Sequence, residues 1–281
     1  MKSIVITGVS SGIGLECVKM FANAGYKVFG SVRKKEDAIK INKEIGPNFI
    51  PLIFDVTNSE AIKESVEITK KNIGNSGLSG LINNAGIAIS GPLMHVPTDE
   101  LQQQFDVNVF GLLNVTRSFL PLLGAKQNYP LTPGKIINIS SVSGKIGYPF
   151  AGPYAASKHA VEAISHSLRR ELLIYGIDVI IVGPGSVNTP IWGKAPVDDV
   201  NVKYGDSDWG KTINRFKEAL NEQEKNYLSA DFVAAKIFDI FHKKKPKTRY
   251  PLYRDKIQSW IIHNLLTDRM LDKIILRKFF K

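Results

Sequence analysis

Short apolar runs rich in β-branched residues alternate along this chain with longer stretches whose apolar residues recur at helical spacing. The runs predict buried strands, and the stretches predict amphipathic helices. The predicted strands are Ser3–Thr7, Lys27–Val32, Phe49–Phe54, Leu78–Asn83, Lys135–Ser140 and Ile177–Gly183. The predicted helices cover Gly12–Ala24 and the stretches near residues 36–45, 59–73, 98–123 and 153–175. This alternation predicts an α/β fold with a doubly wound parallel sheet and helices on both faces.

Two of the predicted helices have recognisable start signals. Thr57 and Glu60 stand at the spacing of a capping box for the helix over 59–73. Thr98 is followed by Asp99 and Glu100, whose carboxylates suit the positive end of a helix dipole. We therefore expect helices to begin at these two places.

Composition narrows the class of protein. The chain has 281 residues, of which 43% are hydrophobic and 22% charged, so a sizeable core can form and disordered or collagen-like classes are excluded. Cys17 is the single cysteine and cannot form an intramolecular disulfide, which indicates a reducing compartment. No apolar run approaches the roughly 18 residues of a membrane-spanning helix. The first residues are too weakly apolar for a signal peptide, so we expect a cytoplasmic protein.

The formal charge of +11 is concentrated near the end of the chain. Residues 242–281 hold 12 Lys and Arg against three Asp and carry +9 of the total. The positive field therefore belongs to this terminal segment. Because no recognition motif is interleaved with these cations, we expect no nucleic-acid partner. A nucleic-acid binder is an alternative that rests on the charge alone.

Candidate ligand-binding residues cluster directly after predicted strands, where parallel sheets bind ligands. In the turn Thr7–Gly14, glycines at 8, 12 and 14 allow a tight turn, a close approach of a pyrophosphate and close helix packing. Such turns also occur without ligands. The other clusters are Asp55, Asn83–Gly86, Ser141 and Pro184–Gly185.

The second predicted strand ends in Arg33, Lys34 and Lys35 and has no acidic residue there. An acid at this point usually accepts hydrogen bonds from the 2′-hydroxyl of an adenosine ribose, and it would repel a 2′-phosphate. The guanidinium of Arg33 can instead bind such a phosphate through charge-assisted hydrogen bonds. The sequence predicts NADP(H) in preference to NAD(H). A solvated basic helix start without a ligand is the alternative.

Tyr154 and Lys158 stand at i, i+4 in a predicted helix and so share one of its faces. Ser141 lies thirteen residues before Tyr154, at the end of a strand. A tyrosine pKa near 10 leaves little phenolate at neutral pH, and a cation about 4–5 Å away lowers that pKa by about 2–3 units. The spacing predicts a general acid/base whose pKa Lys158 lowers. Any helix with a solvated face also offers this pattern.

Together these motifs resemble the classical short-chain dehydrogenase/reductase family, closely over roughly residues 1–190 and loosely beyond. The shared motifs, in the family's order, are Thr7-Gly-x-x-x-Gly-Ile-Gly14, Asp55-Val56, Asn83-Asn84-Ala85-Gly86, Asn108, Ser141, Tyr154-x-x-x-Lys158 and Pro184-Gly185. The glycine spacing favours the classical branch over the extended one. The resemblance implies a Rossmann-type fold. It also implies an oxidoreductase that interconverts an alcohol and its ketone or aldehyde by hydride transfer with NADP(H).

The resemblance implies roles for individual residues. Tyr154 would be the general acid/base, and Lys158 would lower its pKa and bind the nicotinamide ribose. Ser141 would orient the substrate oxygen, so that Ser141 and Tyr154 bind the substrate. Asn108 would hold a water that links Lys158 to solvent. No metal is implied. The cofactor would contact Gly8, Ser10, Ser11, Gly12, Ile13, Gly14, Arg33, Lys34, Asp55, Val56, Asn83, Ala85, Gly86, Tyr154, Lys158, Pro184, Gly185, Val187 and Thr189.

Several of these residues also have a structural interpretation. Asn108 could satisfy backbone groups within a long helix, and Asn83 with Asn84 could only close a turn. The scattered histidines are interpreted as structural or exposed: His95, His159, His166, His242 and His263. A catalytically silent NADP-sensing protein on the same fold is the alternative to an enzyme, and the complete set of four catalytic residues argues against it.

The stretch over about 186–228 corresponds to the variable substrate lid of the family. Apolar residues around the site favour a bulky lipophilic substrate, although they could equally be ordinary core: Leu93, Met94, Val142, Phe150, Ile191 and Trp192. Lys247–Pro251 and Leu265–Arg269 resemble the hydroxysteroid and retinol dehydrogenase subgroup, which suggests a steroid- or retinoid-like substrate. We divide the chain into a catalytic domain over 1–253, lid included, and a basic amphipathic helical segment over 254–281.

In the segment 254–281, apolar residues recur at helical spacing with basic residues between them. These are Ile257, Trp260, Ile261, Leu265, Leu271, Ile274, Ile275 and Phe279. We expect the segment to pack on its own domain, as a lid, or on a partner subunit, and peripheral contact with an anionic bilayer through 255–281 is the alternative. The family's usual assembly through two long helices, here 98–123 and 153–175, implies a homo-oligomer, either a dimer or a tetramer. The loop 124–134 receives no function.

Overall fold

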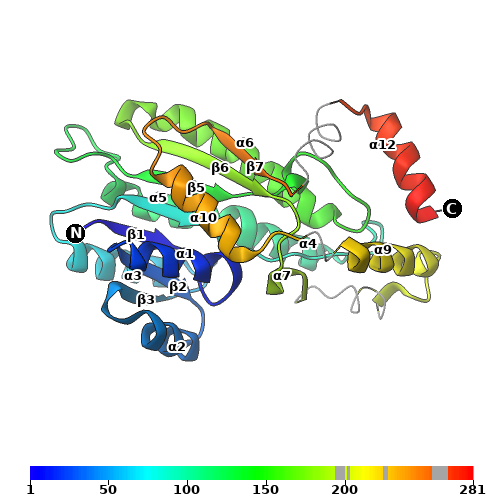
Figure 1. Cartoon of the computed structure of the whole chain (residues 1–281), viewed down its shortest axis with the longest axis horizontal. Helices are drawn as coiled ribbons and strands as arrows, with labels where there is room; N and C mark the ends of the chain where they lie inside the picture. Colours follow the sequence, from blue (N-terminus) through cyan, green and yellow to red (C-terminus); the bar gives the residue numbers. More distant parts are fainter. Residues whose placement is uncertain (194–199, 201–202, 224–226, 255–264, 281) are drawn as a thin grey trace.

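The chain forms a parallel sheet between two layers of helices (Figure 1). The computed structural model describes residues 1–193, 200, 203–223, 227–254 and 265–280. Within these residues seven strands pair in the order β3-β2-β1-β4-β5-β6-β7, all parallel. They are β1 (Ser3–Ile6), β2 (Lys27–Val32), β3 (Phe49–Ile53), β4 (Gly80–Asn83), β5 (Lys135–Ile139), β6 (Asp178–Pro184) and β7 (Arg249–Leu252). The predicted doubly wound, Rossmann-type sheet is confirmed.

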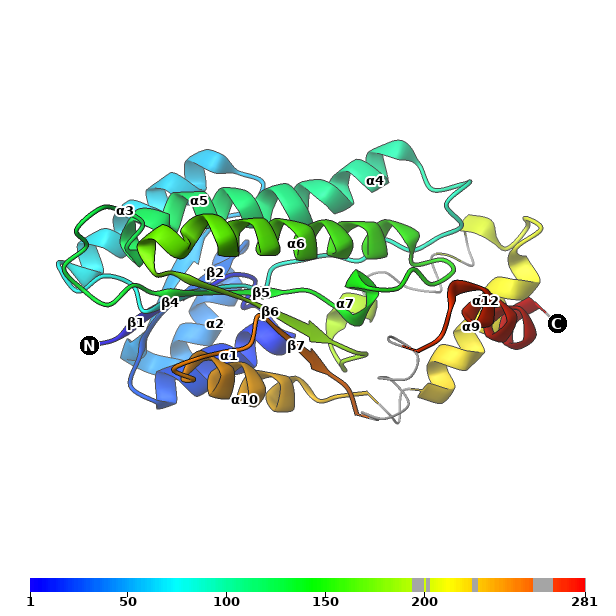
Figure 2. The ribbon, with the colours of Figure 1, turned by 90° about the horizontal axis from the view of Figure 1, so that it is seen from above.

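Helices cover both faces of the sheet, as Figure 2 shows from above. One layer contains α1 (Gly12–Asn23), α2 (Lys35–Ile45) and α10 (Ala230–Phe241). The other contains α3 (Ser59–Ile73), α4 (Thr98–Phe105), α5 (Leu112–Leu123) and α6 (Gly152–Glu171). Two apolar clusters fill the space between each layer and the sheet, one around Phe21 of α1 and one around Phe119 of α5. Burying a side chain of this size contributes about 1.5–3 kcal/mol, so both layers are held by their apolar faces.

The strand order reverses between β1 and β4, which are neighbours in the sheet although β2 and β3 come between them in sequence. The chain runs outwards from β1 to β3 and then returns to continue on the other side through β4. In parallel sheets a crevice opens at such a reversal, beyond the carboxyl ends of the strands. The fold therefore places a ligand site at the end of β1.

Two predicted helix details differ in the structure. The helix over 59–73 is capped by Asn58, whose Oδ1 accepts a hydrogen bond of 3.1 Å from Ala61 N, and not by the predicted capping box of Thr57 and Glu60. Thr57 instead donates to Asp55 Oδ1 from both its backbone N–H and its hydroxyl. The predicted helix 98–123 contains a π-helical segment, η2 (Asp106–Gly111), between α4 and α5. The extra residue that a π-turn accommodates changes which side chains face the sheet.

The structure contains elements that the apolar pattern did not predict. Helix α10 and strand β7 complete the sheet edge and its cover, and short 3-10 helices lie at η1 (Gly46–Asn48), η3 (Val142–Gly144) and η4 (Leu172–Tyr175). Strand β7 has four residues, one of them proline, so it lacked the apolar run that marks the other strands. None of the described helices is long and apolar enough to cross a membrane.

The segment predicted to be a substrate lid, called the lid below, extends beyond the carboxyl end of the sheet. It contains α7 (Pro190–Gly193) and α9 (Gly210–Gln223), and α12 (Asp268–Ile275) and the π-helical η6 (Leu276–Phe280) lie beside it (Figures 1 and 2). Phe150, Trp209 and Phe216 form an aromatic cluster at its centre. Phe279 is buried against Phe216 at a ring distance of 5.4 Å. The described end of the chain thus packs on the lid; residues 255–264 of the predicted terminal segment lie outside the described residues.

Candidate active site

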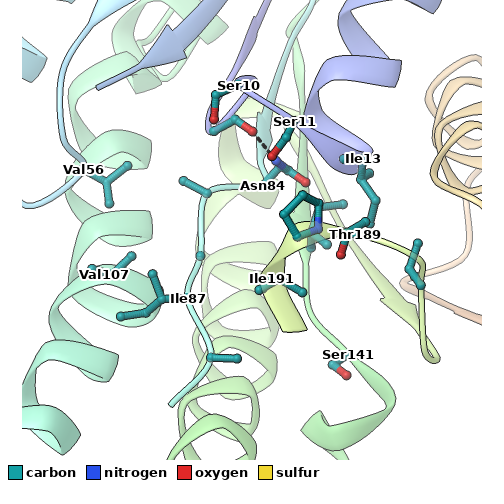
Figure 3. Close-up of a pocket in the computed structure, with 18 of the residues that line it drawn as sticks. Ser10, Ser11, Ile13, Val56, Asn84, Ile87, Val107, Ser141, Thr189 and Ile191 are labelled. Carbon is teal, nitrogen blue, oxygen red and sulfur yellow. Dashed lines mark hydrogen bonds between the residues drawn. The ribbon is translucent and has the colours of Figure 1, made fainter. Parts of the chain in front are cut away.

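A cavity of about 260 Å³ opens at the carboxyl ends of the strands, between the turn after β1 and the start of α6 (Figure 3). Loops that follow β1, β2, β3, β4, β5 and β6 all contribute to its wall. The predicted site residues that line it are Gly8, Ser10, Ser11, Gly12, Ile13, Arg33, Asp55, Val56, Ala85, Gly86, Ser141, Tyr154, Lys158, Pro184, Gly185, Val187 and Thr189. One cavity therefore joins the glycine-rich turn to the Ser141, Tyr154 and Lys158 group.

The glycine-rich turn depends on the absence of side chains. Gly8 and Gly12 have φ angles of +68° and +59°, which favour glycine. A Cβ atom on Gly14 would lie 2.3 Å from the carbonyl oxygen of Gly8, so only glycine lets the helix pack this closely on the turn. Asn84 closes the turn from the other side, where its Nδ2 donates to the carbonyl oxygens of Thr7 and Gly8 at 3.0 and 2.9 Å. The backbone of the turn is thereby held open towards the cavity.

The end of the cavity nearest α1 is suited to an anion. The N-cap residue of α1, Ser11, makes no side-chain cap hydrogen bond, and the first turn of the helix contains no acidic residue. The backbone N–H groups and the positive dipole end of this helix therefore face the cavity without a competing carboxylate. Arg33 lies at the same end with a 65% exposed side chain, and its guanidinium is 3.8 Å from Asp55. These residues fit a dinucleotide that carries an additional phosphate on its adenosine ribose.

At the opposite end of the cavity lie Ser141, Tyr154 and Lys158. Ser141 lies two residues after the end of β5 and caps η3, where its Oγ accepts a hydrogen bond from Ser143 N. Tyr154 and Lys158 sit one turn apart on α6 and are both buried. The Lys158 Nζ donates to the carbonyl oxygen of Ile139 at 2.9 Å and lies 5.6 Å from the centre of the Tyr154 ring. The two side chains share one compartment.

The pKa values of these two groups differ from the sequence expectation. Burial raises the pKa of Tyr154 to about 12, and a hydrogen bond with Ser141 opposes this only in part. Burial also lowers the pKa of Lys158 to about 8, against the opposing charge of Glu162. The sequence argument counted the attraction between phenolate and ammonium but not the cost of removing both from water, which here is the larger effect. The Tyr154 phenol is therefore protonated at neutral pH.

Asn108 lies in the π-helical segment η2, and its side chain is fully engaged. Its Oδ1 accepts from Ile87 N at 2.9 Å, and its Nδ2 donates to Ile87 O and to Ser157 Oγ at 3.0 Å each. The residue thus joins the loop after β4 to the catalytic helix α6. It does not line the cavity, and its role in a water relay stays a prediction.

Three further predicted cofactor residues also lie outside the cavity wall: Asn83, Gly14 and Lys34. Asn83 points into the protein interior, where it donates to Thr116 Oγ1 and Asn138 Oδ1. Successive residues of an extended chain point to opposite sides, so Asn84, the next residue, reaches the cavity in its place. Gly14 packs beneath the turn, and Lys34 is the exposed N-cap of α2. The side chain of Asn83 therefore does not face the cavity, and a contact of this residue with the cofactor stays a prediction.

Several wall residues were not among the predicted ones, notably Ser31, Ile87 and Val107. The Ser31 hydroxyl accepts a hydrogen bond of 3.0 Å from Gly8 N and so ties β2 to the glycine-rich turn. A sequence signal for Ser31 was present, because it stands two residues before Arg33 and residues i and i+2 of a strand share a face. Ile87 and Val107 carry no such signal, since apolar residues line a cavity and a core alike.

The apolar residues predicted to surround the substrate do not all lie together in the structure. Ile191 lines the cavity, whereas Leu93 and Met94 are exposed near the lid. Phe150 is buried in the lid cluster with an unusual φ of +63°, directly before α6. Val142 is half-buried, and the side chain of Trp192 lies outside the described residues. Among those of the six whose side chains the structure describes, Ile191 alone lines the cavity.

Within the described part of the chain, no group of three or more His, Cys, Asp and Glu residues is arranged to hold a metal ion. His242 lies beside Phe21 of α1 and Phe238 of α10, and its Nε2 is 2.9 Å from the Tyr26 hydroxyl. His95 stacks on Tyr204 beneath the lid.

The known proteins that this chain resembles agree with the dinucleotide site described above. A family model described as short chain dehydrogenase matches residues 2–199. An NADPH-dependent 3-dehydrocapnine reductase from Ornithobacterium rhinotracheale is 45% identical over 281 residues, which is 100% of this chain and 98% of that protein. A 3-ketodihydrosphingosine reductase from Bacteroides thetaiotaomicron is 32% identical over 94% of each chain. Among solved structures, an actinorhodin polyketide ketoreductase with NADPH has a TM-score of 0.75 and 27% identity, and the match covers 90% of this chain and 95% of that one.

Proposed function

Because this chain belongs to the short-chain dehydrogenase family, we propose that it is an NADPH-dependent reductase that converts the ketone of a bulky lipophilic substrate into an alcohol. The observation that carries this proposal is the single cavity that contains both the anion-binding turn of α1 and the Ser141, Tyr154 and Lys158 group. When bound, NADPH supplies the hydride. The protein must then orient the carbonyl, bind the cofactor and provide the proton.

Tyr154 is the proton donor in this proposal. With a pKa of about 12 the buried phenol keeps its proton at neutral pH, which suits a general acid in the direction of reduction. Ser141, which already forms a hydrogen bond with Tyr154, donates to the same carbonyl oxygen and polarises it. Lys158 holds the ribose hydroxyls of the cofactor and keeps a positive charge beside the phenol as the proton leaves. Asn108 orients α6 against the loop after β4.

The proposed cofactor is NADP(H) in preference to NAD(H). Arg33 stands where a 2′-phosphate would lie, at the cavity end next to Asp55. An acidic residue at this place would repel that phosphate, whereas a guanidinium forms charge-assisted hydrogen bonds with it. The related 3-dehydrocapnine reductase is described as NADPH-dependent, which supports the same choice.

The proposed substrate is a long-chain lipid that carries a ketone. The names of both curated relatives, 3-dehydrocapnine reductase and 3-ketodihydrosphingosine reductase, describe reduction at carbon 3. The apolar lid cluster of Phe150, Trp209 and Phe216 and the cavity residue Ile191 support a lipophilic chain next to the reacting carbon. A steroid ketone or a retinoid aldehyde is a second candidate, because either apolar molecule meets the same surroundings.

The experiment that tests the proposal is a screen of ketones with the purified full-length protein and either NADPH or NADH. Loss of the nicotinamide absorbance band reports turnover, with 3-ketodihydrosphingosine, a steroid ketone and a short water-soluble ketone as substrates. We expect turnover with NADPH and the lipophilic ketones. The Tyr154→Phe variant is expected to lose turnover by at least about 100-fold while it binds NADPH unchanged, because general acid catalysis contributes about 10²–10⁴-fold. Binding of NADPH without turnover of any ketone would instead support a silent cofactor-sensing protein.

Two exposed surfaces support further proposals, one about self-association and one about contact with a membrane. Phe110 on η2 has 53% of its surface exposed, and the neighbouring helix α6 exposes the small residues Ala156 and Ala163. These exposed residues suit a helix-to-helix contact between two copies of the chain. The terminal helix α12 leaves Met270 and Ile274 half exposed among basic residues, which supports peripheral contact with an anionic bilayer.

A further inference from the structure

A buried ion pair lies directly behind the catalytic residues. The Nε of Arg249 on β7 donates to both carboxylate oxygens of Glu162 on α6, at 2.9 Å each. Only 4% of the Glu162 side chain and 18% of the Arg249 side chain are exposed. Removing two charges from water is costly, so such a pair needs close geometry and further hydrogen bonds to be tolerated.

Two glycines make room for this pair. A Cβ atom on Gly183 of β6 would lie 2.8 Å from Nη2 of Arg249, and one on Gly144 of η3 would lie 3.0 Å from Cγ of Glu162. Neither glycine has the positive φ angle that would itself call for glycine. At Gly183 the guanidinium of Arg249 occupies the space that a side chain would need. At Gly144 the Glu162 side chain shares that space with Ser140 Oγ, which a Cβ atom would meet at 2.7 Å.

The pair touches the catalytic group from two sides. Arg249 Nη2 donates to the backbone carbonyl oxygen of Ser141 at 3.3 Å. Glu162 follows Lys158 by one helical turn on α6, so its carboxylate and the Lys158 ammonium are neighbours on one face. An electrostatic contribution from Glu162 correspondingly raises the pKa of Lys158 against the effect of burial. One ion pair is thus linked both to the serine that contacts Tyr154 and to the lysine beside it.

We propose that Glu162 and Arg249 are positioning residues of the reductase: Arg249 fixes the peptide of Ser141, and Glu162 keeps Lys158 positively charged under working conditions. This inference rests on the proposed function, and it adds a second helical turn to the face that carries Tyr154 and Lys158. It also gives β7 a role, since the edge strand delivers Arg249 from the far end of the sequence.

Other charged groups face Glu162 and have to be separated from this effect. Lys145, which follows η3, places its half-exposed Nζ 3.6 Å from Glu162 Oε2. His166 and Arg169 lie further along α6, and Tyr253 forms a hydrogen bond with Arg249. Of these groups Lys145 is the closest to the carboxylate, but no hydrogen bond to Ser141 or Lys158 is recorded for it in the described part of the chain. It is therefore the matched control.

The first test removes the charge of Glu162 and keeps its shape. Binding of NADPH to wild type, Glu162→Gln and Lys145→Gln is measured by nicotinamide fluorescence from about pH 6 to about pH 10. The ammonium of Lys158 favours binding, so affinity is expected to fall as pH rises through the pKa of Lys158, which is about 8 in the wild type. Without the carboxylate this midpoint is expected to move down by about one pH unit. Lys145→Gln is expected to leave it in place.

The second test separates charge from hydrogen-bond geometry. Arg249→Lys keeps a cation for Glu162 but cannot bind the carboxylate and the Ser141 carbonyl at once. It is expected to keep the wild-type pH midpoint and to lower kcat by about 10-fold or more, because Ser141 loses its fixed position. The double variant Glu162→Gln with Arg249→Gln leaves no unpaired buried charge and shows whether any loss comes from misfolding alone.

The outcomes distinguish this inference from the proposed function. An unchanged pH midpoint in a folded Glu162→Gln protein, or full kcat in Arg249→Lys, would overturn the positioning role. Because the binding titration needs no substrate, it decides the role of Glu162 even if wild type reduces no ketone, a result that would count against the proposed function alone.

Discussion

The two titrating groups of the site, the Tyr154 phenol and the Lys158 ammonium, both shift towards their neutral forms. Burial raises the pKa of Tyr154 to about 12 and lowers that of Lys158 to about 8. At neutral pH the site therefore holds a protonated phenol next to a cation that loses its charge in mildly alkaline solution. This state suits the role proposed for Tyr154 as the proton donor in reduction.

The shifted pKa of Lys158 predicts how stability depends on pH. The folded-state pKa of about 8 lies below the usual value of 10.5, so the cost of burying the charge is fully present below about pH 8 and is relieved as pH rises towards 10.5. Relative to Lys158→Met, the wild type is expected to gain about 2.5 kcal/mol in unfolding free energy between about pH 7 and about pH 10. Denaturant unfolding of both proteins at the two pH values measures this. A constant difference would contradict the buried charge.

Arg33 predicts the choice between cofactors. Arg33→Ser is expected to raise the KM for NADPH by about 10- to 100-fold, the equivalent of one charge-assisted hydrogen bond of about 1.5–3 kcal/mol, and to leave the KM for NADH unchanged. Lys34→Ser is the matched control, because Lys34 is exposed at the N-cap of α2 and does not line the cavity. Steady-state kinetics of wild type and both variants with each cofactor measures these KM values. A wild type that uses NADH and NADPH equally well would refute the role of Arg33.

At the scale of elements, the lid is held partly by the last residues of the chain. Phe279 of η6 is 8% exposed and contacts Phe216 of α9, and Phe280 contacts Trp209. Helix α12, by contrast, has no buried residue. The terminal segment is thus anchored to the lid mainly at its end.

This anchoring predicts local opening in a Phe279→Ala variant. Loss of a buried phenylalanine costs about 3 kcal/mol or more, so the open population of the terminal segment should rise about 100-fold. Brief tryptic digestion followed by mass spectrometry would detect faster cleavage at Arg277 and Lys278. Met270→Ala is the control, because Met270 is half exposed and its truncation should leave the cleavage rate as in wild type. Equal rates in both variants would rule out the anchor.

At the scale of the whole molecule, the layer that contains α4, α5 and α6 presents the surface proposed for self-association (Figure 2). Phe110→Asp is expected to shift the protein towards monomer, because an interface would then bury an unpaired charge. Ile39→Asp on α2 is the control, since Ile39 is 69% exposed in the opposite layer. Sedimentation velocity of the two variants and wild type measures the state. A monomeric wild type would exclude the interface.

The basic terminal segment predicts a salt-dependent affinity for anionic vesicles. Full-length protein and a 1–253 variant are compared in co-sedimentation with phosphatidylserine-containing vesicles and with neutral phosphatidylcholine vesicles. We expect the full-length protein alone to sediment with the anionic vesicles, each surface cation contributing about 1 kcal/mol. Indistinguishable behaviour of the two proteins would remove the bilayer contact.

The sequence alone predicted much of the fold and of the candidate site, because the relevant sequence patterns are local. The alternation of apolar runs and amphipathic stretches predicted the parallel sheet, and the spacing of Tyr154 and Lys158 within one helix is the same in any tertiary context. The positive φ angles of Gly8 and Gly12 are likewise a local property of the turn that favours glycine. The family assignment, the oxidoreductase class and the preference for NADP(H) were all drawn from such motifs.

The tertiary structure decided what depends on distant parts of the chain. Burial, which no single motif reveals, reverses the expected shift of the Tyr154 pKa, because desolvation depends on everything packed around a group. The position of β4 within the sheet determines that the Asn83 side chain points into the interior and the Asn84 side chain towards the glycine-rich turn. The hydrogen bond between Arg249 and Glu162 joins residues 87 positions apart in the sequence. Such long-range relations have no local sequence signal, since they arise only when the sheet brings separate segments together.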